Sequence, residues 1–376
     1  MERVNVGIIG CGNISDIYLK NLTTLYDNVN VLAVSDMNPE AAREQAKKYG
    51  IKKACTDNEE LLAMREIEIV LILTNPASHA ELCKAALRAG KNVYTEKPLA
   101  TNLSEADELI GIAKEKGLLV GCAPDTVLGA GVQTCKKLIA DGWVGTPIGV
   151  RFQNIAVGPE VWHPNPAPFY SAGAGPVLDI GPYYVTCMVY LLGAVKRVAS
   201  LGRTSRNQVL VTSAPHFGES VSPEVHTYVS GLLEFESGVI GSGTLSWDGN
   251  SAADAGVEIV GTEGTIVVPN PDCFGGKTDA IKYKRTEKRE LNGYDPEWAQ
   301  LPVLFSHSGN CRGLGVAEMA AGLRMGRRSR LNGEMARHVL EILLALANPD
   351  KNFVEIQSRF VPMPAMDFST LPGMLR

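Results

Sequence analysis

The chain has 376 residues, 45% of them apolar and 20% charged, which is the balance of a folded globular protein too long for one core. Its 36 Lys and Arg against 41 Asp and Glu give a net charge of −5, which argues against a nucleic-acid partner or an anionic membrane surface. Its eight cysteines include no Cys-x-x-Cys pair, and no His, Asp, Glu or Cys cluster has ligand spacing, so we predict no metal site.

The N-terminus enters a strand-like run without a charged and apolar leader, and no apolar run reaches transmembrane length. We therefore expect a reduced, cytoplasmic protein. The one basic run is more typical of a solvated helix end than of a phosphate site. It consists of Arg324, Arg327, Arg328 and Arg330.

In the first third of the chain, short apolar runs alternate with segments of helical spacing. The runs predicted to be strands are Val4–Gly10, Val29–Ser35, Ile67–Thr74, Asn92–Thr95 and Leu118–Cys122. The predicted helices are Ile14–Leu25, a stretch from Pro39, Ser78–Arg88, and Ser104–Lys116, entered at Ser104. This alternation predicts an α/β domain with a parallel, doubly wound sheet over residues 1–123.

After residue 123 the pattern changes to that of an α+β domain, which we assign to residues 124–376. Its predicted helices are Gly131–Ala140, Leu178–Leu192, Gly313–Arg324 and Gly333–Ala347. Its predicted strands are Ile148–Val157, Thr227–Phe235, Val239–Trp247, Val257–Val260 and Thr265–Val268. The sheet is expected to be large, open and mostly antiparallel. No helix sequence is obviously available to cover both faces, so we predict that another subunit buries one of them, in a homodimer or higher homo-oligomer.

A glycine-rich turn, Gly10-Cys11-Gly12-Asn13-Ile14-Ser15, separates the first strand from the first helix. Gly10 allows a tight turn, and Gly12 lets backbone N–H groups approach a pyrophosphate at the positive end of the helix. The usual third glycine is Ser15, but Asp36 follows 21 residues later at the end of the second strand, where a carboxylate binds ribose hydroxyls. A carboxylate repels a 2′-phosphate and no Arg directly follows Asp36, so this Rossmann domain is predicted to prefer NAD over NADP. Asp36 is also placed to cap the next helix.

Two further segments carry groups able to move a proton beside a dinucleotide. Glu96-Lys97-Pro98 follows the fifth strand, at the edge of the sheet where ligands of open α/β folds bind. The Lys97 ammonium can stabilise a developing alkoxide, with Glu96 orienting it. Asp179 and Tyr183 stand four residues apart at the start of a predicted helix, so both are expected on one face. The plainer interpretations are a solvent-exposed lysine and a first-turn carboxylate stabilised by the helix dipole.

These segments, together with Thr74-Asn75-Pro76 and His79, resemble the Gfo/Idh/MocA family (glucose–fructose oxidoreductase and inositol dehydrogenase) over nearly the whole chain. The resemblance implies a two-domain NAD(P)-dependent dehydrogenase acting on CH–OH groups of sugars, inositols or related polyols, with a cis bond at Lys97-Pro98. It implies that the cofactor contacts are Gly10, Gly12, Asn13, Ile14, Asp36, Thr74, Asn75, His79, Glu96 and Lys97. His79 is expected to contact the nicotinamide side or to cap its helix.

The resemblance assigns the chemistry to Lys97, Tyr183 and Asp179. Most of the family has histidine where Tyr183 stands, so this chain is predicted to be a tyrosine variant of the catalytic motif. A tyrosine with a pKa of about 10 is a poor base at neutral pH unless positive charge stabilises the phenolate. Lys97 and the oxidised nicotinamide are expected to supply that charge. Tyr184, one residue on, is predicted to belong to the core.

Three more residues are predicted to contact the substrate beside Lys97, Asp179 and Tyr183. Trp162 and His163 lie in the segment that the resemblance places over the substrate, where an indole can stack on a sugar face and an imidazole can bind hydroxyls. The alternative is a surface loop anchored by a buried tryptophan. Asp125, at the crossing between the domains, suits a neutral polyol better than an anionic substrate.

The leading hypothesis is an NAD-dependent oxidoreductase that transfers a hydride between nicotinamide and a ring hydroxyl of a sugar, glycoside or cyclitol. One alternative is an enzyme whose tightly bound NAD is recycled within one catalytic cycle. Another is a non-enzymatic NAD-bound sensor or regulator. A sensor need not retain both Lys97 and Tyr183, which favours an enzyme.

Overall fold

The computed structural model describes residues 2–251, 256–282, 298–349 and 352–366. They form two compact units. Unit 1 contains the described residues up to Leu128, Asn310–Leu340 and Met366, and unit 2 contains Gly129–Gly309 and Glu341–Ala365. We placed the boundary after residue 123 and the whole remaining chain in the second domain. The structure instead assigns residues 310–340 to unit 1.

Contacts between residues far apart in the sequence explain why this segment belongs to unit 1. The Tyr26 hydroxyl donates to the carbonyl oxygen of Cys311 at 2.6 Å, and the Asn28 amide donates to the carbonyl oxygen of Ala317 at 2.8 Å. Helix α9 (Leu314–Arg324) is almost wholly buried. These partners are separated by 285 and 289 residues, so no local pattern announces them.

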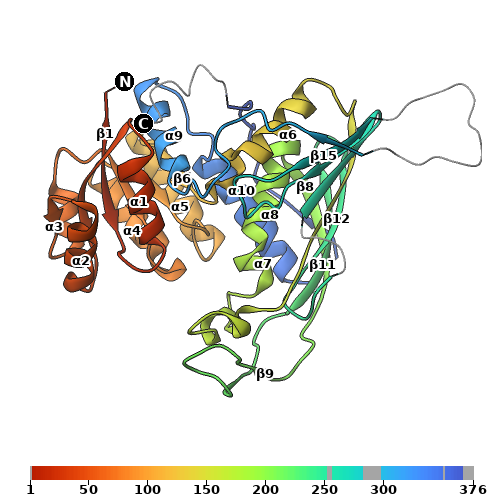
Figure 1. Ribbon diagram of the computed structural model, residues 1–376, viewed down its shortest axis with the longest axis horizontal. Helices are drawn as coiled ribbons and strands as arrows, with labels where there is room; N and C mark the ends of the chain where they lie inside the picture. Colours follow the sequence, from red (N-terminus) through yellow and green to blue (C-terminus); the bar gives the residue numbers. More distant parts are fainter. Residues whose placement is uncertain (1, 252–255, 283–297, 350–351, 367–376) are drawn as a thin grey trace, which may run out of the picture. The chain divides into compact units, whose positions relative to one another are not determined.

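Unit 1 is built on a six-stranded parallel sheet in the order β3-β2-β1-β4-β5-β6 (Figure 1). The strands are β1 (Val4–Ile9), β2 (Val29–Ser35), β3 (Lys53–Ala54), β4 (Ile69–Ile72), β5 (Asn92–Thr95) and β6 (Val120–Cys122). Every residue of β4 and β5 is buried, and neighbouring side chains of a strand point to opposite faces, so both faces are covered. The sheet is doubly wound, as predicted, and its strand order reverses between β1 and β4, where such folds bind ligands.

The helices of unit 1 follow the predicted alternation, with one addition. They are α1 (Ser15–Thr24), α2 (Pro39–Tyr49), α3 (Asn58–Ala63), α4 (Pro76–Arg88), α5 (Leu103–Lys116), the 3₁₀ helix η1 (Asp125–Leu128) and α9. Helix α3 and the two-residue β3 were not predicted, because both are too short to show a period. Helix α5 is capped by Asn102 and not by Ser104, since the Asn102 side chain accepts the Glu105 N–H at 3.0 Å.

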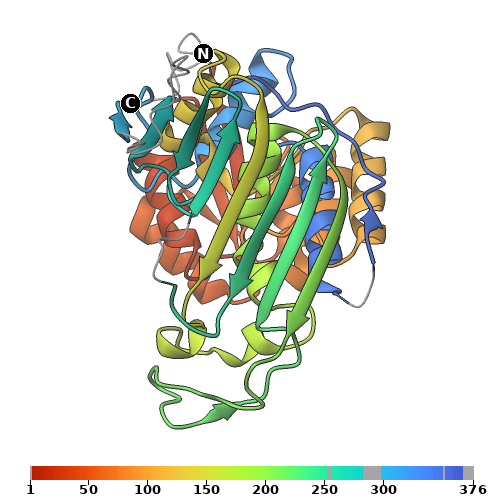
Figure 2. The ribbon, with the colours of Figure 1, turned by 90° about the vertical axis from the view of Figure 1, so that its right-hand side faces the viewer.

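Unit 2 is built on a nine-stranded sheet in the order β16-β15-β14-β13-β7-β12-β11-β8-β17 (Figure 2). The strands are β7 (Pro147–Ile155), β8 (Val195–Arg203), β11 (Tyr228–Phe235), β12 (Ile240–Ser246), β13 (Gly256–Gly261), β14 (Gly264–Val268), β15 (Thr278–Lys282), β16 (Ala299–Leu301) and β17 (Val354–Glu355). Only β12 and β7 run parallel, so the sheet is mostly antiparallel, as predicted. A separate pair is formed by β9 (Val209–Leu210) and β10 (Ser220–Val221).

One face of the large sheet packs against helices of the same unit. These helices are α6 (Ala130–Ala140), α7 (Pro176–Asp179) and α8 (Gly181–Leu192). The opposite face lies open among the described residues of unit 2, as Figure 2 shows. Its side chains include Leu201, Leu232 and Ile240, which are 79%, 48% and 55% exposed, between polar neighbours such as the hydrogen-bonded pair Ser230 and Thr244. The open face is therefore mixed in character, with apolar and polar side chains side by side.

The helix predicted over Leu178–Leu192 is two helices, α7 and α8, which meet at Ile180. Pro182 explains the break, because it has no N–H to donate to the carbonyl four residues earlier and its ring crowds that carbonyl. Gly181 also packs closely, since a Cβ added there would lie 2.7 Å from the Leu343 side chain. Asp179 ends the first helix and Tyr183 lies in the first turn of the second, so they do not share the face of one helix.

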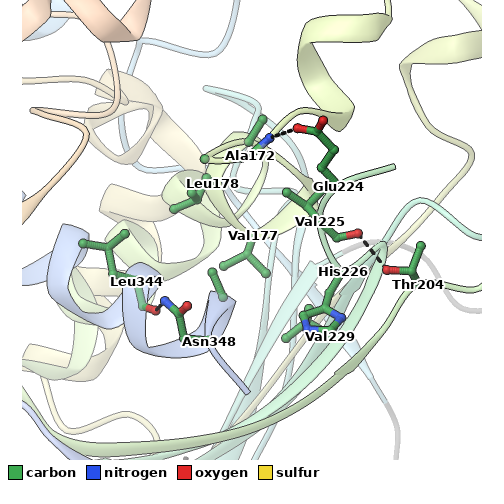
Figure 3. Close-up of a pocket in the computed structure, with 13 residues that line it drawn as sticks. Ala172, Val177, Leu178, Thr204, Glu224, Val225, His226, Val229, Leu344 and Asn348 are labelled. Atoms are coloured by element: carbon green, nitrogen blue, oxygen red, sulfur yellow. Dashed lines mark hydrogen bonds between the residues drawn. The ribbon is translucent and has the colours of Figure 1, made fainter. Parts of the chain in front are cut away.

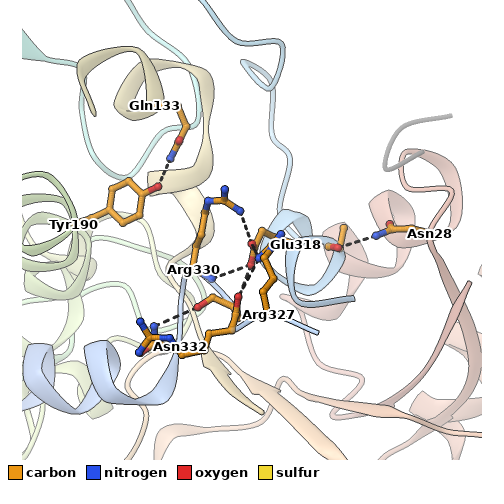
Figure 4. A network of polar contacts seen from close by, with 10 residues as sticks. Asn28, Gln133, Tyr190, Glu318, Arg327, Arg330 and Asn332 are labelled. Atoms are coloured by element: carbon orange, nitrogen blue, oxygen red, sulfur yellow. Dashed lines mark hydrogen bonds and ion pairs between the residues drawn. The ribbon is translucent and has the colours of Figure 1, made fainter. Parts of the chain in front are cut away.

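The basic run is partly solvated, since the Arg328 side chain is 52% exposed, and its guanidinium groups pair with carboxylates inside unit 1. Glu318, which is fully buried, pairs with both Arg327 and Arg330 (Figure 4). Arg324 donates two hydrogen bonds to the Glu68 carboxylate, at 2.6 and 2.8 Å. The run therefore fastens the last turn of α9 and the segment after it to unit 1.

Helix α10 (Gly333–Ala347) has the predicted bounds and crosses the division between the units along the chain. Within the ranges given above, no helix is long and apolar enough to span a membrane.

Candidate active site

The glycine-rich turn between β1 and α1 has the shape that a dinucleotide requires. Gly10 has φ +103°, and a Cβ added there would lie 2.7 Å from the carbonyl carbon of Leu73, so no other residue fits. A Cβ on Gly12 would meet no atom within 4 Å, so its backbone faces open space. Helix α1 has no capping side chain at Ile14, which leaves the positive end of the helix to an outside partner. The residues present therefore fit a pyrophosphate.

Asp36 is held against this turn. The Cys11 N–H donates to its Oδ2 at 2.7 Å, and the Asn38 N–H donates to its Oδ1 at 2.8 Å. The alternative role as a helix cap falls to Asn38, whose side chain accepts the Glu40 N–H. Two backbone donors thus fix the Asp36 carboxylate at the end of β2, where the ribose of a dinucleotide would lie.

Thr74 and Asn75 lie where β4 leads into α4. The Ser78 hydroxyl donates to the Asn75 carbonyl oxygen at 2.9 Å and lies 2.7 Å from the Thr74 hydroxyl. Asn75 makes no side-chain cap to α4, so the start of this helix also lacks a capping side chain. This arrangement agrees with the predicted cofactor contact of both residues without testing it.

His79 is fully buried and joins the start of α4 to the lysine segment. Its Nδ1 lies 2.7 Å from the carbonyl oxygen of Pro98, and its Nε2 lies 3.1 Å from that of Thr74. Both ring nitrogens thus lie beside carbonyl oxygens, so His79 links two backbone segments. Its expected contact with the nicotinamide side stays a prediction.

Glu96 and Lys97 follow β5, and the Lys97–Pro98 bond is cis, as the resemblance implied. The Glu96 carboxylate accepts the Tyr18 hydroxyl at 2.6 Å and the backbone N–H of Lys97 at 3.0 Å. Burial and the nearby Glu96 charge hold the pKa of Tyr18 well above its ordinary value, so the hydroxyl stays a donor. Glu96 therefore fixes the backbone of Lys97, and the Lys97 side chain extends from a held point.

Asp125, which we predicted to contact the substrate, is buried in unit 1, and that contact stays a prediction. It is 1% exposed, and its Oδ2 accepts the N–H groups of Gly313 at 2.8 Å and Gly315 at 3.1 Å. These are the first backbone donors of α9, so Asp125 caps that helix from a distance of 188 residues. This capping role was not predicted, because α9 returns to unit 1, which the local sequence does not show.

In unit 2, Asp179 ends α7 and Tyr183 begins α8, with the Tyr183 ring 9% exposed. Tyr184 is fully buried, as predicted, and its hydroxyl contacts the side-chain amides of Asn154 at 3.2 Å and Asn270 at 3.4 Å. Burial raises the pKa of Tyr184 to about 12. The two neighbouring tyrosines thus have different surroundings, and Tyr184 is a core residue.

Trp162 and His163 follow the 3₁₀ helix η2 (Pro159–Val161). The Trp162 side chain is 63% exposed, so the alternative of a buried anchor is excluded. The two rings meet edge to face with centroids 5.3 Å apart. The buried anchor of this segment is instead Tyr170, in η3 (Ala167–Tyr170), which is 1% exposed.

A separate pocket of about 350 Å³ lies within unit 2 behind α7 (Figure 3). Its edge is closed by Glu224, whose carboxylate accepts the Ala172 N–H at 2.9 Å. Its walls include Val177 and Leu178, the two residues before Asp179. Neither Asp179 nor Tyr183 lines it, so this pocket is not the catalytic site that the sequence predicts.

The fold and the turn at Gly10 are those of a dinucleotide-binding Rossmann domain. Residues 4–123 match the model of the "Oxidoreductase family, NAD-binding Rossmann fold", and residues 132–267 match that of the "GFO/IDH/MocA C-terminal domain". The chain therefore belongs to the Gfo/Idh/MocA family of oxidoreductases.

Individual relatives are distant in sequence but span most of the chain. An oxidoreductase of Formosa agariphila is 28% identical over 313 residues, which cover 81% of this chain and 89% of the relative. The myo-inositol 2-dehydrogenase of Thermotoga maritima is 27% identical over 268 residues, covering 71% and 75% of the two chains. A levoglucosan dehydrogenase solved in complex with NADH superposes with a TM-score of 0.78 at 20% identity, over 95% of this chain and all of that one. The last comparison shows the fold alone.

Three buried residues that hold the candidate site were not found from the sequence. Tyr18 supports Glu96 in unit 1, and Glu160 and Tyr170 support the Trp162 segment in unit 2. Tyr18 lies in an apolar helical repeat. The repeat predicts that its ring is buried in the core, but it does not predict a partner for its hydroxyl. Glu160 stands in a Pro/Gly-rich stretch that has no period, so its burial could not be inferred.

Proposed function

We propose that the protein is an NAD-dependent dehydrogenase that oxidises a ring hydroxyl of a sugar, glycoside or cyclitol. The observation that carries the proposal is the held segment Glu96-Lys97, which sets a lysine at the carboxyl edge of a dinucleotide-binding sheet. Membership of the Gfo/Idh/MocA family and the dehydrogenases among its relatives support this assignment.

In the proposed reaction, Lys97 and Tyr183 act on the same hydroxyl. Bound NAD supplies the hydride acceptor. Lys97 donates a hydrogen bond to the alcohol oxygen and stabilises the negative charge that develops there. Tyr183, as the phenolate, accepts the hydroxyl proton while the hydride leaves the carbon, so the electron pair of the O–H bond becomes part of the C=O bond. Asp179 orients the substrate or Tyr183.

Asp36 supports a preference for NAD over NADP. Its carboxylate is fixed by the N–H groups of Cys11 and Asn38, so it cannot turn away from a group bound at the end of β2 without breaking these bonds. It accepts hydrogen bonds from ribose hydroxyls and repels a 2′-phosphate. The next residue, Met37, is 98% exposed and carries no positive charge to offset that repulsion.

The open face of the nine-stranded sheet supports a homodimer or higher homo-oligomer. Leu201, Leu232 and Ile240 are three large apolar side chains left to solvent on one face. Burial of this face by a second copy of the chain would remove these apolar side chains from water and so stabilise the assembly.

The test is a screen of sugars, glycosides and inositols for NAD reduction, in which the absorbance of NADH is the readout. We expect at least one cyclic polyol to be oxidised by the wild type and not by Lys97→Ala. No reduction by any compound would overturn the assignment as a freely turning-over dehydrogenase. NAD that stays with the purified protein, together with conversion of the sugar and no net NADH, would instead support recycling within one catalytic cycle.

A further inference from the structure

Trp162 is an exposed ring on a firmly held segment. Its backbone N–H donates to the Pro159 carbonyl oxygen at 3.2 Å, and the N–H of His163 donates to the same oxygen at 2.8 Å. The Ser213 hydroxyl donates to the His163 carbonyl oxygen at 2.6 Å. The backbone that carries this 63% exposed side chain is therefore held by several hydrogen bonds.

A buried carboxylate, that of Glu160, anchors the segment that carries Trp162. Glu160 is 4% exposed, its carboxylate accepts the Tyr170 hydroxyl, and its carbonyl oxygen accepts the N–H groups of Thr212 and Ser213 at 2.9 and 3.0 Å. Tyr170 packs against Trp247 in a small buried cluster, with ring centroids 5.4 Å apart. The anchor thus joins the loop to the main sheet of unit 2.

A chain of aromatic rings connects this buried cluster to the surface. Trp247 meets Phe169 at 6.4 Å, Phe169 meets His163 at 4.7 Å, and His163 meets Trp162 at 5.3 Å, all with interplanar angles between 63° and 82°. Such edge-to-face contacts hold a ring while leaving much of its surface free. Trp and His side chains have only two rotatable bonds, so a ligand that meets them orders little.

His163 adds a polar group to this surface. Its Nδ1 lies 2.8 Å from the Asn165 carbonyl oxygen and 3.0 Å from the Asn165 backbone nitrogen. In the proposal below, its Nε2 is the atom that binds a hydroxyl group. An apolar ring face beside a single hydrogen-bonding nitrogen matches the apolar C–H face and hydroxyl rim of a sugar ring, or the ring of an aryl glycoside.

The surface lies a short way from Asp179 along the chain. The Gly175 N–H donates to the Phe169 carbonyl oxygen at 3.0 Å, and Asp179 is four residues further on, which corresponds to about 6 Å of helix rise. A backbone hydrogen bond therefore joins the segment that carries Trp162 to the start of the helix that ends at Asp179.

We propose that Trp162 and His163 form a second subsite that binds the aglycone ring of a glycoside, either a second sugar or an aryl group. The substrate class is then a two-ring glycoside and not a free monosaccharide. This inference rests on the proposed function, because the ring that is oxidised must occupy the site of Lys97 and Tyr183.

The test compares a monosaccharide that the screen identifies with the phenyl glycoside and the disaccharide of the same sugar. Trp162→Ala should raise KM for both two-ring compounds by about tenfold, the scale of one lost ring contact, with kcat nearly unchanged. KM for the monosaccharide should change by less than about twofold. Trp162→Phe should restore most of the loss, since it keeps an apolar ring. Trp298→Ala is the matched control, since Trp298 is a 46% exposed tryptophan of unit 2 outside the aromatic chain.

Binding measured without turnover separates this inference from the proposed function. Phenyl glycosides and disaccharides are titrated into the full-length protein by calorimetry, with and without Trp162→Ala. Binding that depends on Trp162, in a protein that oxidises no sugar, would support the subsite and reject the dehydrogenase. Equal KM changes for one-ring and two-ring substrates, or no change for either, would reject the subsite while leaving the dehydrogenase in place.

Discussion

Asp125 is the residue of unit 1 in which burial and charge oppose each other most directly. Burial raises the pKa of its carboxyl from 3.8 to about 6, although the N–H groups of Gly313 and Gly315 favour the charged form. A rise of about two pH units corresponds to about 3 kcal/mol of penalty on the ionised group. The two N–H groups therefore offset only part of the burial penalty on the ionised Asp125 carboxylate.

The sign of the pH dependence follows from the raised value. Below the unfolded pKa, both states hold the proton and the penalty is absent. As the pH rises from about 4 to about 6, the unfolded chain loses its proton first, so the free energy of unfolding falls, and it levels off above pH 6. Asp125→Asn keeps an oxygen for the two N–H groups and removes the charge. Relative to the wild type, its free energy of unfolding should rise by up to about 3 kcal/mol between pH 4 and pH 7.

Urea unfolding at pH 4, 5, 6 and 7 measures this difference. Circular dichroism is the suitable signal, because all four tryptophans lie in unit 2. Hydrogen exchange of the Gly313 and Gly315 amides reports on the cap itself. Glu66→Gln, at an exposed position, is the control and should show no trend. A difference between Asp125→Asn and wild type that does not vary with pH would refute the reasoning.

The remaining predictions concern the proposed chemistry, the cofactor and the assembly. Tyr183→Phe should lower kcat by a factor of about 10²–10⁴, with the Kd for NAD unchanged. A near-normal kcat with the same pH profile would show that another residue is the base, and His163 is the next candidate. Lys97→Ala should lower kcat by at least as large a factor. In the double variant, kcat should fall by a factor much smaller than the product of the two single factors. Tyr184→Phe should change kcat by no more than a few-fold. The wild type should have a kcat/KM at least about tenfold higher with NAD than with NADP, or ~1.4 kcal/mol. Asp36→Ala should reduce this difference between the two cofactors. An equal or inverted preference in the wild type contradicts the assignment. Light scattering at micromolar concentration should give a mass of at least two chains, and a clean monomer would remove the predicted subunit contact.

The predictions from the sequence succeeded where the signal is local. Alternating apolar runs and helical periods identified five of the six strands of unit 1, and the turn at Gly10 lies where the motif placed it. Asp36 also contacts that turn, because a carboxylate at the end of β2 has only the adjacent βα loop to meet.

The errors have two physical causes. The break at Ile180 was visible in principle, since Pro182 cannot continue a helix that has already begun, but the apolar repeat around it favoured one long helix. The contacts of Asp125 and of the basic run were not predicted for another reason. Their partners, Gly313 and Glu318 among them, reach them only through the tertiary fold, as α9 returns to unit 1.

In both units, a hydrogen bond from a buried tyrosine to a carboxylate holds the segment that carries the candidate functional residue. In unit 1 a buried tyrosine, Tyr18, donates to Glu96, the residue directly before Lys97. In unit 2 a buried tyrosine, Tyr170, donates to Glu160, two residues before Trp162. Burial and the adjacent carboxylate raise the pKa of both phenols, so each hydroxyl stays protonated and donates. A loop residue that must meet a ligand cannot be fixed by its own side chain, so the fixed point lies one or two residues earlier. The acidic residues beside Lys97 and Trp162 are therefore best understood as supports, and the lysine and the indole as the groups that they present.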